Sequence, residues 1–193
     1  MFEKAVTPRI RDTHLTDAAM FQSTHTGSNA HSNGKKLSQA LLSAFRLLKA
    51  EQQTDIEIPE TVFYRRYITH GGIRYSTRTV HQGNSSIFIP STNFDHGIPA
   101  HIEHILETRD GHYFLAVSLH RPLAAWAVQE DPFRKYAVLG LEMWSSDIDL
   151  TQLHIIHPSV LEDSPHFANW NMPWMMGGEQ LDVSVIMPLP RVS

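Results

Sequence analysis

Three histidines, His96, His101 and His104, lie close together in the segment DHGIPAHIEH of this 193-residue chain. Imidazole is the commonest metal ligand in proteins, and Asp95 or Glu103 would add a carboxylate, so the cluster raises the alternative of a histidine-dependent metal enzyme. On a strand, side chains at i and i+3 point to opposite faces, so His101 and His104 converge only if the segment is helical or bulged. Surface or hydrogen-bonded histidines are the simpler interpretation.

Other patterns that indicate catalysis are missing from the sequence. It has no cysteine, which removes disulfides, thiolate nucleophiles and zinc sites that need sulfur. It contains no Gly-x-Ser-x-Gly, no phosphate-binding loop and no dinucleotide fingerprint. Serines, histidines and aspartates for a hydrolytic triad are present, but no motif supports one. The sequence therefore favours a domain without catalytic activity, and it predicts no cofactor.

Four aromatic side chains lie within one short stretch that includes loops. They are Trp126, Phe133, Tyr136 and Trp144. Aromatic faces hold a methylated ammonium by cation-π attraction once the cation is desolvated, and Glu142 or Asp131 could pair with a basic residue. Burial in the core is the alternative for these aromatic residues. We take Trp126, Phe133, Tyr136, Glu142 and Trp144 as the candidate peptide-binding residues.

Arginines are concentrated in two runs with the spacing of extended strands, at residues 61–68 and 73–80. These runs flank Gly71 and Gly72 and are typical of a hairpin. The arginines are Arg65, Arg66, Arg74 and Arg78. Such a strip could face phosphates, which makes nucleic-acid binding a further alternative. A solvated sheet face is the simpler interpretation. The formal net charge of −4 argues against a general nucleic-acid-coating role, because non-specific binders usually carry a basic excess.

The clearest structural signal is a hairpin formed by residues 102–107 and 113–119, with Asp110 and Gly111 at its turn. Residues 36–53 are predicted to form an amphipathic helix, since Leu37, Leu41 and Phe45 recur at helical spacing. The polar segment over residues 1–35 is predicted to be a flexible arm.

Shorter runs predict further strands at residues 86–90, 136–144, 154–158 and 183–187. Residues 82–84 are expected to form a turn, residues 91–99 a loop and residues 164–178 an irregular stretch, while LAAWAV after Pro122 fits either a short strand or one helical turn. Many strands and one helix predict a mostly β (α+β) fold. We expect a small antiparallel barrel or curled sheet with the helix packed on it, in a single domain over residues 36–193.

Several segments resemble the bromo-adjacent homology (BAH) domain, a β-rich chromatin interaction module. They are GNSSIFI at 83–89, PAHIEHI at 99–105, His120-Arg121-Pro122, EMWS at 142–145 and the strand at 156–160. The resemblance implies a role in chromatin, with a histone tail as a partner.

A longer stretch resembles the C-terminal part of uncharacterised fungal open reading frames that accompany DNA transposons. RYSTRTVHQGNSSIFI, DPFRKY and the IIHPSVL and HFA segments carry this resemblance. It implies a transposon-encoded or domesticated interaction domain in the nucleus.

The sequence as a whole favours a protein-interaction module that binds another protein or a peptide. No apolar run approaches the roughly 20 residues that span a bilayer, so we expect an intracellular protein without a membrane partner, nuclear rather than cytoplasmic. The oligomeric state is left open.

Overall fold

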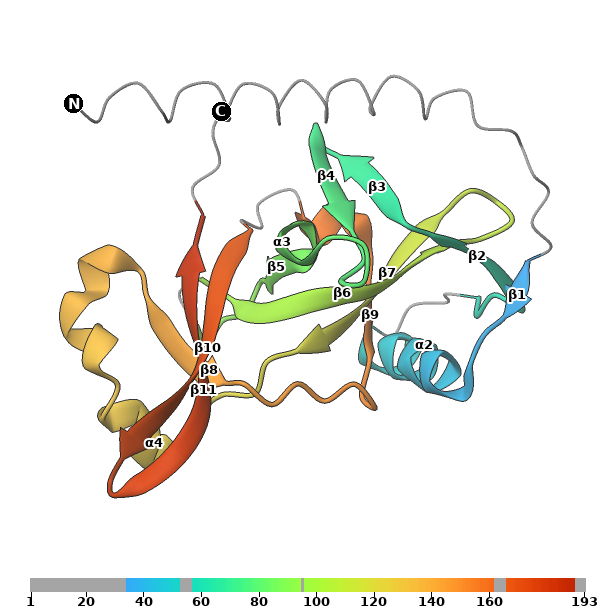
Figure 1. The fold of residues 1–193 in the computed structure, drawn as a ribbon. Helices are drawn as coiled ribbons and strands as arrows, with labels where there is room; N and C mark the ends of the chain where they lie inside the picture. The colour runs from blue at the N-terminus through green and yellow to red at the C-terminus, as the bar shows by residue number, and fades with distance from the viewer. Residues whose placement is uncertain (1–33, 53–56, 95, 162–165, 190–193) are drawn as a thin grey trace, which may run out of the picture. The chain divides into compact units, whose positions relative to one another are not determined.

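The predicted central hairpin is confirmed as the pair of strands β6 (Ile98–Glu107) and β7 (Tyr113–Leu119). Gly111 has a φ of 81°, a left-handed conformation that glycine adopts without steric cost, and it allows the tight turn between the strands. The register shifts between Ile102 and His104, which indicates a β-bulge around Glu103. This hairpin is the centre of the larger of two main sheets (Figure 1).

The computed structural model describes residues 34–52, 57–94, 96–161 and 166–189, which belong to a unit spanning Gly34–Ser193. The predicted arm over residues 1–35 therefore lies outside the described residues, except for its last two positions. Within the described ranges the fold is mostly β, as predicted, and all the strand pairs are antiparallel. No path of paired strands closes into a barrel in this part of the chain.

The larger sheet has the order β1-β2-β6-β7-β9, and β5 pairs with β6 as well. Its other strands are β1 (Lys35–Lys36), β2 (Thr61–Arg65), β5 (Ser86–Ile89) and β9 (His154–Ile156). One edge of β6 thus pairs with β5 near its start and with β2 near its end. Between these two strands the amide of Arg78 donates to the carbonyl of Ile102 at 2.7 Å, which fills the gap along this edge.

The predicted hairpin around Gly71 and Gly72 is confirmed, with shorter strands than expected. It consists of β3 (Tyr67–His70) and β4 (Ile73–Ser76), and β2 ends before β3 begins and pairs with β6 instead. The turn predicted at residues 82–84 is one turn of helix, α3 (Gln82–Ser85). His81 caps this helix, because its Nδ1 accepts from the amide of Asn84 at 3.1 Å.

The second sheet is three-stranded, in the order β10-β11-β8. It comprises β8 (Glu142–Ser145), β10 (Phe167–Met176) and β11 (Glu179–Pro188). The prediction of an irregular stretch at residues 164–178 is wrong for residues 167–176, which pair with β11 along their whole length. Pro173 and the neighbouring asparagines have low strand propensity, but pairing across the hairpin outweighs that preference.

Helices lie against both sheets. The predicted helix at 36–53 is confirmed as α2 (Gln39–Gln52), whose Leu41, Phe45 and Leu48 pack against Val62 and Leu106 of the larger sheet. The segment left open as strand or helix forms α4 (Ala125–Gln129), followed by the 3-10 helix η1 (Pro132–Leu139). The prediction of extended structure at 136–144 is therefore wrong up to residue 139 and correct for β8. A second 3-10 helix, η2, spans Pro158–Leu161.

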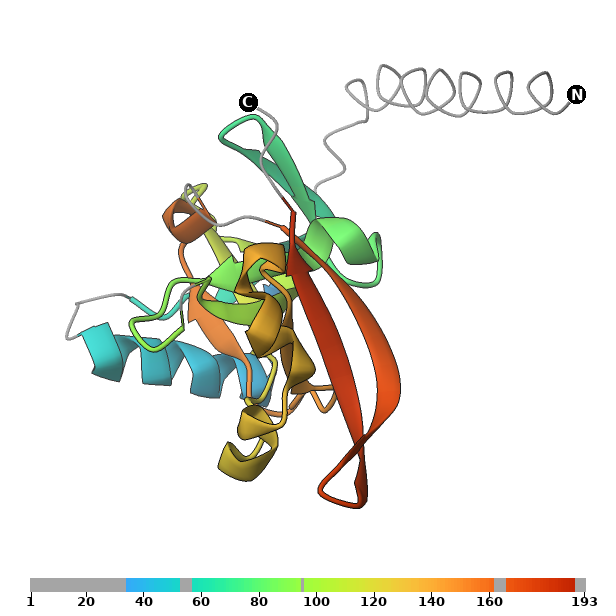
Figure 2. The same cartoon turned by 90° about the vertical axis from the view of Figure 1, so that its left-hand side faces the viewer.

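Apolar side chains are buried in separate clusters on the two faces of the larger sheet. Leu106 and Ala116 belong to the cluster under α2, whereas the adjacent residues Ile105 and Leu115 belong to the cluster on the opposite face, as the two-residue period of a strand requires. A further cluster joins Phe88 of β5 to the second sheet. The second sheet also packs on α4 and η1, beside which its long β10–β11 hairpin runs (Figure 2).

Candidate functional site

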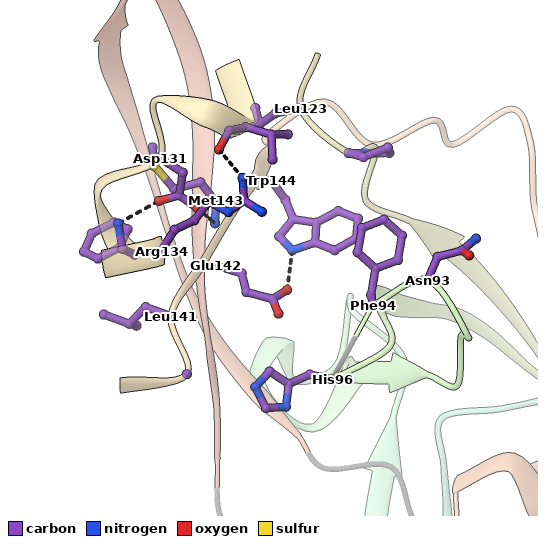
Figure 3. Close-up of a pocket in the computed structure, with 14 residues that line it drawn as sticks. Asn93, Phe94, His96, Leu123, Asp131, Arg134, Leu141, Glu142, Met143 and Trp144 are labelled. Carbon is purple, nitrogen blue, oxygen red and sulfur yellow. Dashed lines mark hydrogen bonds between the residues drawn. The ribbon is translucent and has the colours of Figure 1, made fainter. Parts of the chain in front are cut away.

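A pocket of about 390 Å³ opens between the loop after β5, the α4–η1 segment and β8 (Figure 3). Its lining comprises Asn93, Phe94, His96, Pro122, Leu123, Val128, Asp131, Phe133, Arg134, Gly140, Leu141, Glu142, Met143 and Trp144. The lining mixes apolar and aromatic side chains with charged ones, so it offers both packing surface and polar contacts to a bound group. We therefore take it as the candidate binding site.

Glu142 and Trp144 form the best-defined part of the lining. They are two positions apart on β8, so both side chains leave the strand on the same face. The indole Nε1 of Trp144 donates to Oε2 of Glu142 at 3.0 Å, and the indole ring packs against the ring of Phe94, with the ring centres 4.7 Å apart (Figure 3). The side chain of Trp144 is only 2% exposed, so packing fixes its position. The carboxylate of Glu142 is thereby held by the indole of Trp144, which in turn packs on Phe94.

Asp131 and Arg134 also line the pocket, but their polar atoms form hydrogen bonds with backbone groups of the protein. Oδ1 of Asp131 accepts from the amide of Phe133 at 2.8 Å and Oδ2 accepts from the amide of Met143 at 3.4 Å, so this carboxylate joins η1 to β8. Nη1 of Arg134 donates to the carbonyl of Val128 at 3.3 Å. Glu142 is therefore the carboxylate in this pocket best placed to meet a ligand.

The structure brings together Phe133, Glu142 and Trp144 from the predicted peptide-binding set. Trp126 is not part of the pocket lining; its side chain is 41% exposed, and its ring lies near Gly177 at the tip of the β10–β11 hairpin. The side chain of Tyr136 is not among those that the structure describes. Phe94 was not predicted as a pocket residue; it is an isolated aromatic residue in a polar loop, and that isolation is the signal that could have identified it.

The three clustered histidines have different surroundings. His96 lines the pocket and its ring lies 6.2 Å from that of Phe88, whereas the ring of His104 lies 5.6 Å from that of Tyr64. The bulge in β6 places His101 and His104 on the same face of the strand, as a shared metal site would require. His101, however, forms its contact with His120, and the Nε2 atoms of these two rings are 3.1 Å apart. The described residues contain no group of three or more ligands that could hold a metal ion.

Burial changes the pKa of these imidazoles. Desolvation lowers the pKa of His101 to about 3, with further lowering by the nearby His120 and Arg78. Desolvation also lowers the pKa of His120 and the pKa of His104. All three side chains are thus held in their neutral form at neutral pH.

The predicted basic strip is divided among several local interactions. Arg65 forms an ion pair with Glu107, and Nη1 of Arg78 lies 3.6 Å from Oε1 of Glu103. The guanidinium of Arg74 stacks 3.8 Å from the centre of the Tyr67 ring, and Arg66 is exposed. The charges of Arg65 and Arg78 are therefore partly balanced by carboxylates on β6.

Comparisons with protein families, with curated proteins and with solved structures find no match for this chain. Among the helices that the structure describes, none has the length and apolar character needed to cross a membrane.

Proposed function

We propose that this protein is an interaction module without catalytic activity, and that its pocket takes a basic side chain from an extended segment of a partner protein. The observation that carries the proposal is the carboxylate of Glu142, held in the pocket by the indole of Trp144, which packs on the ring of Phe94. A carboxylate attracts a cation, and an aromatic face within about 6 Å of the cation adds to this attraction.

The volume and composition of the pocket support the same proposal. About 390 Å³ lies near the lower end of the range for small-molecule sites, which suits one long side chain and its neighbours. Leu123 and Leu141 supply apolar surface for the methylene groups of a lysine or arginine, while Glu142 meets the charged end.

The wider biological setting rests on the resemblance to BAH domains. We propose a nuclear protein of chromatin, with a histone tail as one source of the basic segment. We also propose that the larger sheet is curled, as in a β-rich interaction module. Two strands, β5 and β2, pair with the same edge of β6, and β6 has a bulge between them, which bends a strand. The alternatives of a metal enzyme and of nucleic-acid binding have less support, since the clustered histidines have separate contacts and two of the four arginines face carboxylates.

An array of lysine- and arginine-containing peptides, including histone-tail segments with unmodified and trimethylated lysine, tests the proposal. The best-binding peptide is then titrated against the wild type, Glu142→Gln and a control, Glu179→Gln, at the exposed start of β11. Glu142→Gln keeps an oxygen for the Trp144 indole but removes the charge. We expect roughly tenfold weaker binding for this variant, because a charge-assisted contact is worth about 1.5–3 kcal/mol.

The control separates this site from general charge effects. Glu179→Gln changes the net charge by the same amount and should bind as the wild type does. Equal affinity of the wild type and Glu142→Gln, or no binding of any peptide by the wild type, would contradict the proposed function.

A further inference from the structure

His101 and His120 form a buried pair between the two sheets. His101 belongs to β6 and is 0% exposed, while His120 follows β7 and is 2% exposed. The ring of Phe167, at the start of β10, lies 5.4 Å from the ring of His101 and 6.0 Å from that of His120. The pair therefore lies where the second sheet packs on the larger one.

A chain of hydrogen bonds passes through both imidazoles. Nδ1 of His101 lies 3.2 Å from the hydroxyl of Ser86 on β5, the two Nε2 atoms are 3.1 Å apart, and Nδ1 of His120 lies 3.1 Å from the carbonyl oxygen of Ser145 on β8. The chain thus runs from the larger sheet to a backbone carbonyl of the second sheet.

The acceptor at the end of this chain fixes where the protons lie. A carbonyl oxygen only accepts, so Nδ1 of His120 carries a proton and its Nε2, in the neutral ring, accepts. Nε2 of His101 must then donate, which leaves its Nδ1 to accept from the hydroxyl of Ser86. Every member is satisfied in this arrangement, with both imidazoles neutral.

One extra proton can enter the chain without breaking a hydrogen bond. Nδ1 of His101 would then donate to the hydroxyl of Ser86, which turns to the carbonyl of Gln82 at 3.0 Å. A second proton cannot be accommodated in this way. It would give both imidazoles a positive charge, and their two Nε2–H groups would then face each other across 3.1 Å. Even the first charge is costly in a site closed to water.

The neighbouring charges also oppose protonation. Arg78, from the loop after β4, lies close enough to disfavour a positive charge on either histidine. Glu103 of β6 is a carboxylate two positions from His101, but its Oε1 accepts from Ser118 at 2.7 Å and lies 3.6 Å from Nη1 of Arg78. On the remaining sides, Nδ1 of His166 bonds to the carbonyl of Ser86 at 2.9 Å, and Arg121, next to His120, pairs with Asp149 at 2.6 Å.

We propose that the His101–His120 pair is a pH-sensitive link that holds β8 and its sheet against the larger sheet when both imidazoles are neutral, and releases it in acid. Opening the interface would hydrate both rings and return their pKa values to about 6.5. The open form then binds more protons than the closed form below that pH, so acid favours opening. This proposal does not depend on what the pocket binds.

Histidine NMR of the 15N-labelled full chain tests the link directly. At pH 7.5 we expect the Nδ1–H tautomer for His120 and the Nε2–H tautomer for His101. Neither ring should take up a proton near pH 6.5 in the folded protein. Titration of either buried ring near pH 6.5 in the folded protein would overturn the proposal.

Denaturant unfolding at pH 7.5 and pH 5.0 gives a second test. For one imidazole whose pKa rises from about 3 to about 6.5 on release, the equilibrium constant for unfolding should increase roughly thirtyfold between these pH values. The double variant His101→Phe/His120→Leu should lose most of this increase, while His112→Gln should keep it. The same pH dependence in the double variant and the wild type would also overturn the proposal. If the double variant does not fold, the NMR titration decides alone.

Discussion

Asp131 shows how a single carboxylate can serve the fold at a site where the sequence suggested a ligand contact. Its side chain is 9% exposed and its oxygens accept from the amides of Phe133 and Met143. Aspartate is favoured where a helix begins, because its short side chain can accept from an amide two residues ahead. Asp131 therefore fixes both the start of η1 and its distance from β8, and with them the width of the pocket.

Replacing Asp131 with alanine should destabilise the protein by about 1–3 kcal/mol, because two amides would lose their acceptor in a buried setting. Asp131→Asn keeps one oxygen and should lose less. Urea unfolding monitored by tryptophan fluorescence measures both values. A loss that is equal in the two variants would show that the charge, rather than the accepted hydrogen bonds, matters at this position.

Residue type predicted part of the pocket and none of the histidine link. Phe133, Glu142 and Trp144 were identified because aromatic and acidic side chains lie close together in the sequence, and proximity on one strand keeps Glu142 and Trp144 adjacent. His101 and His120 flank the predicted hairpin at residues 102–107 and 113–119, so that hairpin brings them near each other. Their direct contact was not predicted, because the bulge around Glu103 shifts the register between β6 and β7 and no local pattern indicates it.

At the scale of elements, the loop between β5 and β6 supplies Phe94 and His96 to the pocket and ends at Gly97. This glycine has a φ of 91°, and a Cβ there would press against the carbonyl oxygen of Ile89, well inside van der Waals contact. Ile89 is paired with Ile98 directly across the strands. Because Gly97 has no Cβ, its backbone can lie against the carbonyl of Ile89, and this allows Ile89 and Ile98 to pair at the end of the loop.

Gly97→Ala should destabilise the protein by more than the ~1–2 kcal/mol of a left-handed alanine, because the Cβ also clashes with backbone. Gly71→Ala is the matched control, since Gly71 has a φ of 57° and nothing within 4 Å of the added Cβ. Thermal unfolding of the two variants isolates the clash. Equal losses at the two positions would mean that the loop moves aside without cost.

The elements that were predicted best have a clear periodic pattern of apolar residues in the sequence. Leu41, Phe45 and Leu48 repeat at helical spacing, and α2 follows that pattern closely. The strand β10 was missed because Pro173 disfavours a strand, although Trp170, Met172 and Trp174 do alternate with polar or small residues. Pairing with β11 is a long-range interaction, so it can override the local preference that a sequence displays.

At the scale of the whole molecule, the fold consists of two main sheets whose contact is narrow and chemically mixed. Phe88, Trp144, Phe167 and Ile186 form its apolar part, and the His101–His120 pair forms its polar part. The larger sheet has its own cores on both faces, whereas the second sheet depends on this contact and on α4 and η1. The second sheet should therefore open before the larger one.

Hydrogen exchange can follow the two sheets separately in the full chain. At neutral pH the amides of β6 and β7 should exchange most slowly, because β6 is paired along both edges and Ile105 of β6 and Leu115 of β7 are fully buried. Lowering the pH from 7.5 to 5.0 should speed exchange in β8, β10 and β11 first, after correction for the intrinsic effect of pH on exchange. Both histidines gain protons only when the contact opens, so acid lowers the free energy of that opening ahead of global unfolding. An equal increase in both sheets would show instead that the domain opens as one unit, and His112→Gln should behave as the wild type in either case.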